Sequence, residues 1–258
     1  MAFRIALFDM DGTLLDTLRD LAQAINTSLT SCGYTDANCT PQEAAQYFGS
    51  GARAAFMRVL AKRQGVDTAQ LLQIKQSSQP DDLLIDMDAV EKLNREFERY
   101  YTRHSNDYSR PYPGIIDMLQ TLTERQVQCA IVSNKIDSEV KRLAAHYFGD
   151  YVQAAFGLTS SVAPKPAPDL VHAALEALSS DGVLSSSDGT TSNPANQAIS
   201  LDDIVYIGDT EIDLLCARNA GIACISVDWG FRSKDSLLQQ RASCIVSNVQ
   251  QLTDAILS

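Results

Sequence analysis

Short, continuous apolar runs separated by amphipathic helical patterns restrict this chain to a small set of folds. The runs are typical of strands and cover Ile5–Phe8, Cys129–Val132, Ala154–Phe156, Ile204–Ile207, Ala223–Val227 and Cys244–Val246. The helical patterns that separate them include Asp137–Phe148, Pro168–Leu178 and Glu211–Ala220. Strands without polar alternation are buried on both faces, as in a parallel sheet with helical crossovers. We therefore expect the α/β class, with a Rossmann-like parallel sheet and helices on both of its faces.

Residues 17–112 interrupt this alternation with helical patterns alone. Apolar residues recur at helical spacing from Leu18 to Cys32, and Thr40-Pro41-Gln42-Glu43 has the form of a capping box. Further helices are expected at Ala52–Gln64, Thr68–Ser77 and Asp88–His104. No strand is expected in this part. The pattern predicts a core domain of residues 1–16 and 113–258, an inserted helical domain of residues 17–112, and hinges at Asp16-Thr17 and Ser109–Pro113.

A second interruption, at residues 179–200, is rich in Ser, Gly, Thr and Asn. Its apolar surface is too small to hold it in place by burial. It is also longer than most connections in compact domains. We expect a flexible loop within the core domain.

Composition excludes several classes of protein. A net charge of −11 and a pI near 4.6 repel polyanions, so nucleic acid is not an expected partner. There is no apolar run of transmembrane length, and a first strand that begins near Arg4 leaves no room for a signal peptide. The six cysteines form no Cys-x-x-Cys pair, which favours reduced thiols. These features predict a cytoplasmic protein with no membrane partner.

Polar residues stand where the apolar strands end. Asp9 and Asp11 follow the first strand with Gly12 beside them, Ser133 closes the second, and Asp209 closes the strand that begins at Ile204. In parallel sheets, ligands bind beyond the carboxyl ends of the strands. Two carboxylates this close need a cation between them or a shared proton. The pattern predicts one crevice with an acidic, cation-binding floor.

The motifs occur in a characteristic order along the chain. Phe8-Asp9-Met10-Asp11-Gly12-Thr13, then Ser133-Asn134-Lys135, then Lys165 between two prolines, then Gly208-Asp209-Thr210 with Asp213 form an ordered set. The set resembles the haloacid dehalogenase-like (HAD) superfamily, and within it the phosphoglycolate phosphatase-like enzymes. The resemblance spans Phe3 to about Ser247. It implies that the helical insertion is a cap that closes over the crevice, and that the protein is a Mg²⁺-dependent phosphatase acting on a small phosphorylated metabolite.

The resemblance also implies a role for each motif residue. Asp9 would attack phosphorus and form an aspartyl phosphate, and Asp11 would serve as general acid and base. Mg²⁺ would bridge Asp9, the backbone carbonyl of Asp11 and Asp209. Thr13, Ser133, Asn134 and Lys165 would bind the phosphate. Lys165 would also neutralise the transferring group, and Thr13 would orient Asp9 or its loop through its hydroxyl.

Other positions remain open at this stage. The position of Asp213 is compatible with four roles: a metal ligand, a partner of a metal-bound water, a side chain that supports Asp209, or a carboxylate that stabilises a helix N-terminus. Thr210 is expected to orient Asp209, and Lys135 is expected to be peripheral. In the cap, Gly49, Ser50, Gly51 and Arg53 fit either a substrate-contacting turn or an ordinary helix–helix turn. Trp229-Gly230-Phe231-Arg232 reads as a packing loop at the core edge.

Alternative functions share the same first motif. A sugar phosphomutase resembling β-phosphoglucomutase, a nucleotidase and a pyrophosphatase all need Asp9 and Asp11. A non-catalytic binding protein is less expected because Asp9, Asp11, Lys165 and Asp209 are all present. The substrate and the oligomeric state stay open.

Overall fold

A parallel sheet forms the centre of the computed structural model, which describes residues 2–74, 84–179 and 199–258. Within these ranges the sheet has six strands in the order β5-β4-β1-β6-β7-β8. Their bounds are β1 Ile5–Phe8, β4 Gln128–Ile136, β5 Ala154–Leu158, β6 Ile204–Gly208, β7 Ala223–Val227 and β8 Ile245–Val246. Each neighbouring pair is parallel. The predicted α/β class is confirmed.

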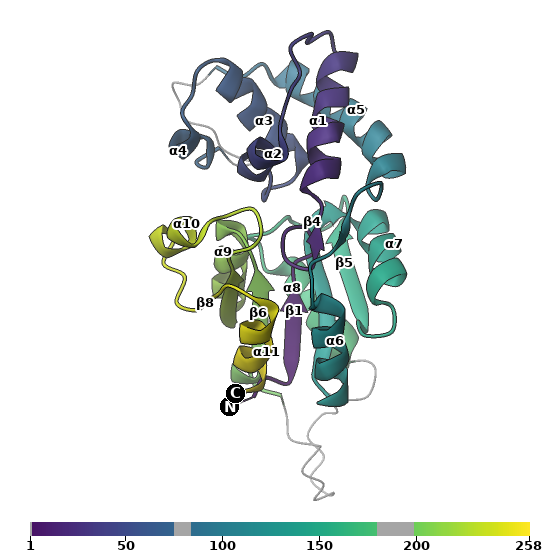
Figure 1. Cartoon of the computed structure of the whole chain (residues 1–258), viewed down its shortest axis with the longest axis vertical. Coiled ribbons are helices and arrows are strands. Elements are labelled where there is room, and N and C mark those ends of the chain that lie inside the picture. Colours follow the sequence, from purple (N-terminus) through teal and green to yellow (C-terminus); the bar gives the residue numbers. More distant parts are fainter. Residues whose placement is uncertain (1, 75–83, 180–198) are drawn as a thin grey trace, which may run out of the picture.

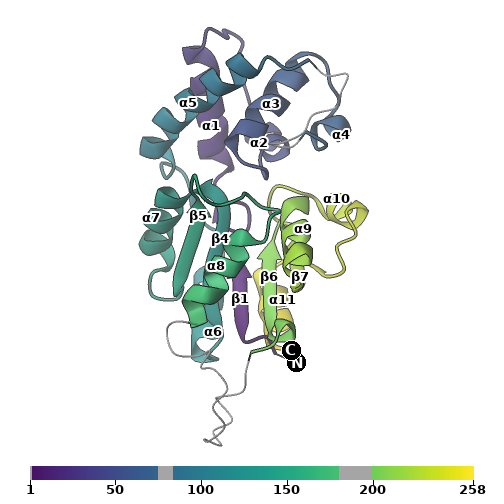
Figure 2. The same ribbon diagram turned by 180° about the vertical axis from the view of Figure 1, so that it is seen from behind.

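Helices cover both faces of this sheet (Figures 1 and 2). They are α6 Ile115–Glu124, α7 Asp137–Phe148, α8 Asp169–Leu178, α9 Glu211–Ala220, α10 Lys234–Gln239 and α11 Val249–Leu257. Alternate residues of β1 enter different apolar clusters: Ala6 and Phe8 pack with α6, α7 and α11, whereas Ile5 and Leu7 pack with α8 and α9. The central strand is therefore buried on both sides, as its unbroken apolar run predicts.

The helical insertion stands above the carboxyl ends of the strands (Figure 1). It contains α1 Leu18–Ser31, α2 Pro41–Tyr47, α3 Ala52–Arg63, α4 Thr68–Leu71 and α5 Met87–His104. We call these five helices and their turns, residues 18–104, the cap. The capping box at Thr40 and Glu43 is present. The helix expected at Thr68–Ser77 ends already at Leu71, and positions 75–77 lie outside the described residues.

Two short strands join the cap to the sheet. β2, Leu15–Asp16, pairs antiparallel with β3, Arg110–Pro111. The expectation of no strand in residues 17–112 is therefore wrong, because a two-residue strand that ends in proline has no alternation to reveal it. Above this ribbon the buried Asp20 carboxylate accepts hydrogen bonds from the backbone N–H groups of Tyr108 and Ser109 and from the Ser109 hydroxyl.

The predicted flexible loop at 179–200 falls almost wholly on residues 180–198, which lie outside the described ranges. On its two sides, Leu178 ends α8, and Ile199 packs against the apolar cluster beneath that helix. All six cysteines carry free thiols. Among the described helices, none has both the length and the apolar character needed to cross a bilayer.

Candidate active site

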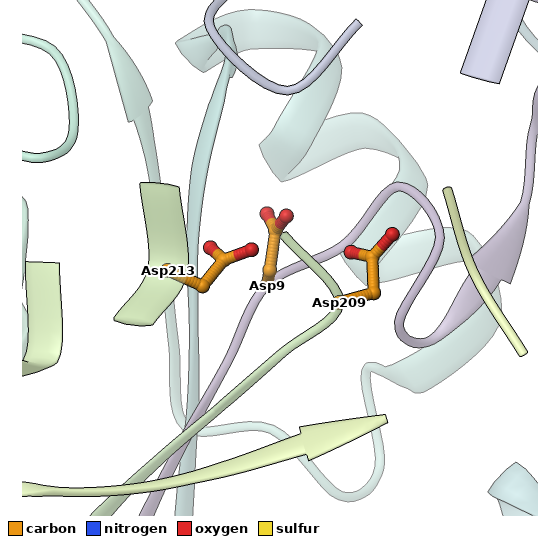
Figure 3. Close-up of side chains that lie close together, drawn as sticks. All are labelled: Asp9, Asp209 and Asp213. Atoms are coloured by element: carbon orange, nitrogen blue, oxygen red, sulfur yellow. The ribbon is translucent and has the colours of Figure 1, made fainter. Parts of the chain in front are cut away.

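Three buried carboxylates meet at the carboxyl edge of the sheet (Figure 3). Asp9 follows β1, Asp209 follows β6, and Asp213 lies in the first turn of α9. One oxygen from each lies within 4.8 Å of the others. The register explains the meeting, because Phe8 pairs with both Ile131 of β4 and Ile207 of β6.

Chain segments packed closely around Asp209 hold its carboxylate in place. One of its oxygens accepts the backbone N–H of Phe231 at 2.6 Å, and the other accepts the Thr13 hydroxyl at 3.0 Å. Gly12 has a φ of +86°, and a Cβ there would lie 2.3 Å from the carboxylate. A Cβ on Gly230 would meet the same oxygen at 2.3 Å. Both glycines are therefore needed for chain segments to pass this close to the carboxylate.

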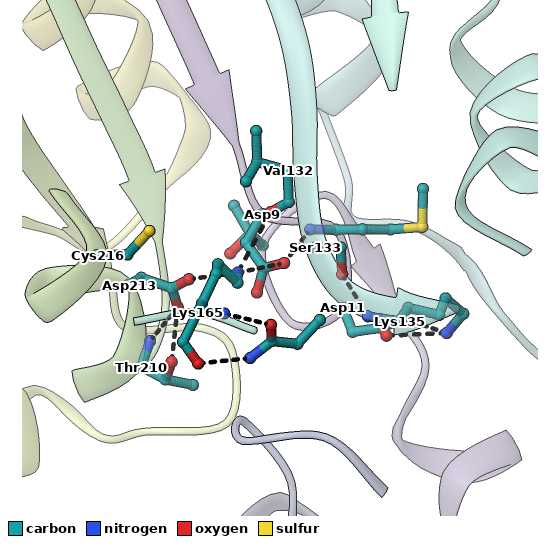
Figure 4. Close-up of polar contacts among 12 residues, drawn as sticks. Asp9, Asp11, Val132, Ser133, Lys135, Lys165, Thr210, Asp213 and Cys216 are labelled. Atoms are coloured by element: carbon teal, nitrogen blue, oxygen red, sulfur yellow. Dashed lines mark hydrogen bonds and ion pairs between the residues drawn. The ribbon is translucent and has the colours of Figure 1, made fainter. Parts of the chain in front are cut away.

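Lys165 lies between two of the carboxylates (Figure 4). Its Nζ is 3.0 Å from Asp9 Oδ1 and 2.7 Å from Asp213 Oδ1, and it also donates to the Tyr206 hydroxyl and the Val132 carbonyl. Asn134 secures the lysine's backbone, accepting its N–H at 2.8 Å and donating to its carbonyl at 3.1 Å. The side chain of Asn134 is thus used to hold the loop that carries Lys165.

Asp213 has protein partners on both carboxylate oxygens. Oδ1 accepts from Lys165, and Oδ2 accepts the backbone N–H and the hydroxyl of Thr210 at 3.0 and 2.6 Å. This is a capping box at the start of α9. The Thr210 hydroxyl binds Asp213 and not Asp209, so the role expected for Thr210 is wrong. The hydroxyl that bonds Asp209 belongs to Thr13.

The electrostatics of this cluster favour a bound cation. Burial, with the nearby charges of Asp213 and Asp11, raises the pKa of Asp9 to about 7 even though Lys165 opposes the shift. Burial and the neighbouring Asp213 and Asp9 raise the pKa of Asp209 well above its ordinary value. Three carboxylates facing one ammonium leave uncompensated negative charge, which a divalent ion relieves. A small, hard set of oxygen donors suits Mg²⁺.

Asp11 forms an ion pair with a different lysine, Lys135. Lys135 Nζ lies 2.9 and 2.8 Å from its two carboxylate oxygens and 2.8 Å from the hydroxyl of Tyr101, a residue of α5 in the cap. The side chain of Lys135 is only 4% exposed. The expectation that Lys135 is peripheral is wrong. The spacing offers a signal, because Lys135 stands two positions after Ser133 in β4 and both residues line the same cavity.

A cavity of about 380 Å³ opens between the core and the cap. Asp9, Asp11, Ser133, Asn134, Lys135 and Thr210 line its core side. Three of the four cap positions singled out from the sequence, Gly49, Gly51 and Arg53, line the other side, and Arg53 is paired with Glu91 at 2.6 Å. The hydroxyl of the fourth, Ser50, accepts a hydrogen bond from the buried Arg58 and so serves the cap interior.

Comparisons with known proteins agree with this geometry. Residues 6–227 match the family model described as haloacid dehalogenase-like hydrolase. A solved structure from Lactobacillus delbrueckii subsp. bulgaricus, provisionally assigned as a phosphoglycolate phosphatase, is 33% identical with a TM-score of 0.87, and the match covers 100% of both chains. Phosphoglycolate phosphatases of Pseudomonas fluorescens and Aquifex aeolicus are 25% and 24% identical, over 96% and 97% of this chain and 78% and 97% of theirs. The chain belongs to the haloacid dehalogenase-like hydrolases.

Proposed function

We propose that this protein is a Mg²⁺-dependent phosphatase that hydrolyses a small phosphomonoester of the phosphoglycolate type through an aspartyl phosphate. One observation carries the proposal: Asp9, beside Lys165 and two further buried carboxylates, faces a cavity between core and cap that Asp11 also lines. The relatives named above support the substrate class. The size of the cavity suits a small metabolite.

In this mechanism Asp9 is the nucleophile and attacks phosphorus in line. Asp9 and Asp209 would hold Mg²⁺ with the backbone carbonyl of Asp11, and the ion supplies charge neutralisation between carboxylate and phosphate. Lys165 places a second positive charge against Asp9, and its four contacts hold it there. The Ser133 hydroxyl, which lines the cavity, donates to a phosphate oxygen, with the Asn134 backbone beside it.

Asp11 transfers the protons. In the first half-reaction it protonates the leaving oxygen, and in the second it accepts a proton from the water that attacks the aspartyl phosphate. Lys135, which also donates to the Tyr101 hydroxyl, holds the side chain of Asp11 at the cavity wall. Because Tyr101 belongs to the cap, the closed cap completes this arrangement.

Asp213 acts mainly through Lys165. Its oxygens are engaged by Lys165 and Thr210, so it anchors the lysine and balances its charge while staying within reach of the cation site. The cap, residues 18–104, would move as one unit on the β2–β3 ribbon. Closure would then exclude water from the aspartyl phosphate until the leaving group departs.

The test is a phosphate-release screen of the purified protein with Mg²⁺. Its panel contains phosphoglycolate, hexose monophosphates, nucleoside monophosphates, pyrophosphate and p-nitrophenyl phosphate. We expect release from phosphoglycolate and from p-nitrophenyl phosphate, loss of both with EDTA, and loss of both in Asp9→Asn. Conversion of a labelled hexose monophosphate into its isomer without phosphate release would instead identify a mutase.

A further inference from the structure

The loop between β7 and α10 belongs to the core and contacts the cap. It rises from the sheet toward the turn between α2 and α3 (Figures 1 and 2). Phe231 of this loop is 9% exposed and belongs to the apolar cluster of the cap. Among the buried members of that cluster in the described ranges, it is the one residue from outside 18–104. Closing the cap therefore buries a core side chain in the cap interior.

Arg232, the next residue, binds both sides of the interface. Its guanidinium pairs with Glu211 at 2.8 and 3.0 Å, donates to the Phe48 carbonyl at 3.0 Å and also donates to the Ala45 carbonyl. Both carbonyls lie at the end of α2, where a helix leaves acceptors without partners. Arg232 is only 4% exposed, so these contacts are shielded from water. Opening the cap would deprive the carbonyls of this donor.

A second arginine, from the cap itself, also holds the turn. Arg58, fully buried in α3, donates to the Tyr47 carbonyl at 2.7 Å and to the Ser50 hydroxyl at 3.0 Å. Arg58 stays with the cap when the cap moves, whereas Arg232 stays with the core. Of these two arginines, Arg232 is therefore the one whose contacts with the turn are formed when the cap closes and lost when it opens.

The same loop sets the position of Asp209. The backbone N–H of Phe231 donates to that carboxylate, and Gly230 lies so close that a Cβ would overlap it. Glu211, the partner of Arg232, begins the helix that starts two residues after Asp209. Movement of this loop therefore changes the cap contact and the carboxylate position together.

We propose that Arg232 is a positioning residue that latches the α2–α3 turn onto the core and couples cap closure to cation binding at Asp209. This coupling is reciprocal: a cation that favours the placed carboxylate favours the closed cap, and the closed cap strengthens cation binding by the same factor. The inference rests on the proposed function only for the identity of the cation.

Hydrogen exchange of the full chain, with and without Mg²⁺, tests the latch without any turnover. The variant is Arg232→Met, and Lys234→Met at an exposed position two residues away is the matched control. In the wild type and the control we expect Mg²⁺ to slow exchange in peptides covering 45–51. In Arg232→Met we expect exchange there to be at least about tenfold faster, with the Mg²⁺ response lost and Mg²⁺ affinity by calorimetry about tenfold weaker. Arg232→Lys, which keeps the charge but lacks the planar fork, should lie between.

Two results overturn the proposal. One is equal protection of 45–51 and equal Mg²⁺ affinity in Arg232→Met and the wild type. The other is faster exchange throughout β1 and β4 as well, which makes Arg232 a support of the whole fold and not a latch. Neither result depends on phosphate release, so a failed activity screen leaves this test intact.

Discussion

Asp9 and Asp11 are two positions apart, yet each faces its own lysine. Lys165 reaches Asp9 from the loop before α8, and Lys135 reaches Asp11 from the end of β4. Asp9 shares its surroundings with two more buried carboxylates, whereas Asp11 is partly exposed to the cavity. In the proposed mechanism, this separation lets two neighbouring aspartates take different roles: nucleophilic attack for Asp9 and proton transfer for Asp11.

Lys135→Met tests whether the second lysine positions the proton-transfer residue. We expect kcat on phosphoglycolate to fall by about 10²-fold, because a misplaced general acid loses most of its usual contribution. Lys141→Met is the control, since Lys141 is 60% exposed and pairs only at the surface with Asp137. On p-nitrophenyl phosphate, whose leaving group needs little protonation, the loss should be smaller. Equal losses on both substrates would contradict a role through Asp11.

The raised pKa of Asp9 predicts how pH and metal act together. In the metal-free protein Asp9 keeps its proton up to about pH 7, whereas the unfolded chain releases it near its ordinary value. The unfolded state thus binds fewer protons in that window, and Asp9's contribution to stability falls as pH rises toward 7. Mg²⁺ binds the ionised form and offsets this loss. We expect Mg²⁺ to raise Tm more at about pH 8 than at about pH 5. This difference should become smaller in Asp9→Asn without vanishing, because burial also raises the pKa of Asp209. A Mg²⁺ effect equal at both pH values would count against it.

At the scale of elements, loops between a strand and a helix build the site. The ends of β1 and β6 follow from apolar runs that stop before Asp9 and Asp209, whereas β4 continues past Ser133 to Ile136. The sequence alone predicts that Asp9, Ser133 and Asp209 meet at one edge of the sheet. The partners of Lys135 and Arg232 do not follow in this way. Tyr101 lies 34 residues from Lys135, and the Phe48 carbonyl lies 184 residues from Arg232, so only the packing of the cap on the core brings them together. No local pattern encodes a contact between two separately packed units.

Gly230→Ala tests the close packing around Asp209. The added methyl would lie 2.3 Å from the carboxylate, so the side chain or the loop must shift. We expect Mg²⁺ affinity to fall by about tenfold or more, since orientation by surrounding groups governs metal binding. Gly33→Ala is the control, because Gly33 has a φ of +93° but nothing within 4 Å of its Cβ. That control should cost about 1–2 kcal/mol of stability and leave affinity unchanged. Calorimetry and denaturation separate the two effects.

At the scale of the whole molecule, cap and core are joined by two chain crossings. The β2–β3 ribbon and the Asp20 contacts to residues 108–109 tie these crossings together. The latch at Arg232 lies apart from this ribbon, in the loop that reaches the α2–α3 turn. A cap held at a hinge and released at a latch can open as a unit.

Asp20→Ala tests the hinge. It leaves the N–H groups of Tyr108 and Ser109 without their buried acceptor, and we expect a loss of about 2–4 kcal/mol in the free energy of unfolding. Asp88→Ala, at an exposed position in α5, is the control and should stay within about 0.5 kcal/mol of the wild type. Urea denaturation measures both. An Asp20→Ala protein as stable as the control would mean that the hinge contacts contribute nothing.

Trapping the phosphorylated enzyme is the most direct test of the proposed aspartyl phosphate on Asp9. The protein is mixed briefly with p-nitrophenyl phosphate and Mg²⁺, quenched in acid and digested, and the tryptic peptide Ile5–Arg19 is weighed by mass spectrometry. We expect that peptide to gain one phosphoryl group on Asp9, to gain more in Asp11→Asn because the second half-reaction lacks its base, and to gain none in Asp9→Asn. Phosphate release by the wild type at full rate, with the peptide unmodified in both the wild type and Asp11→Asn, would contradict covalent catalysis by Asp9.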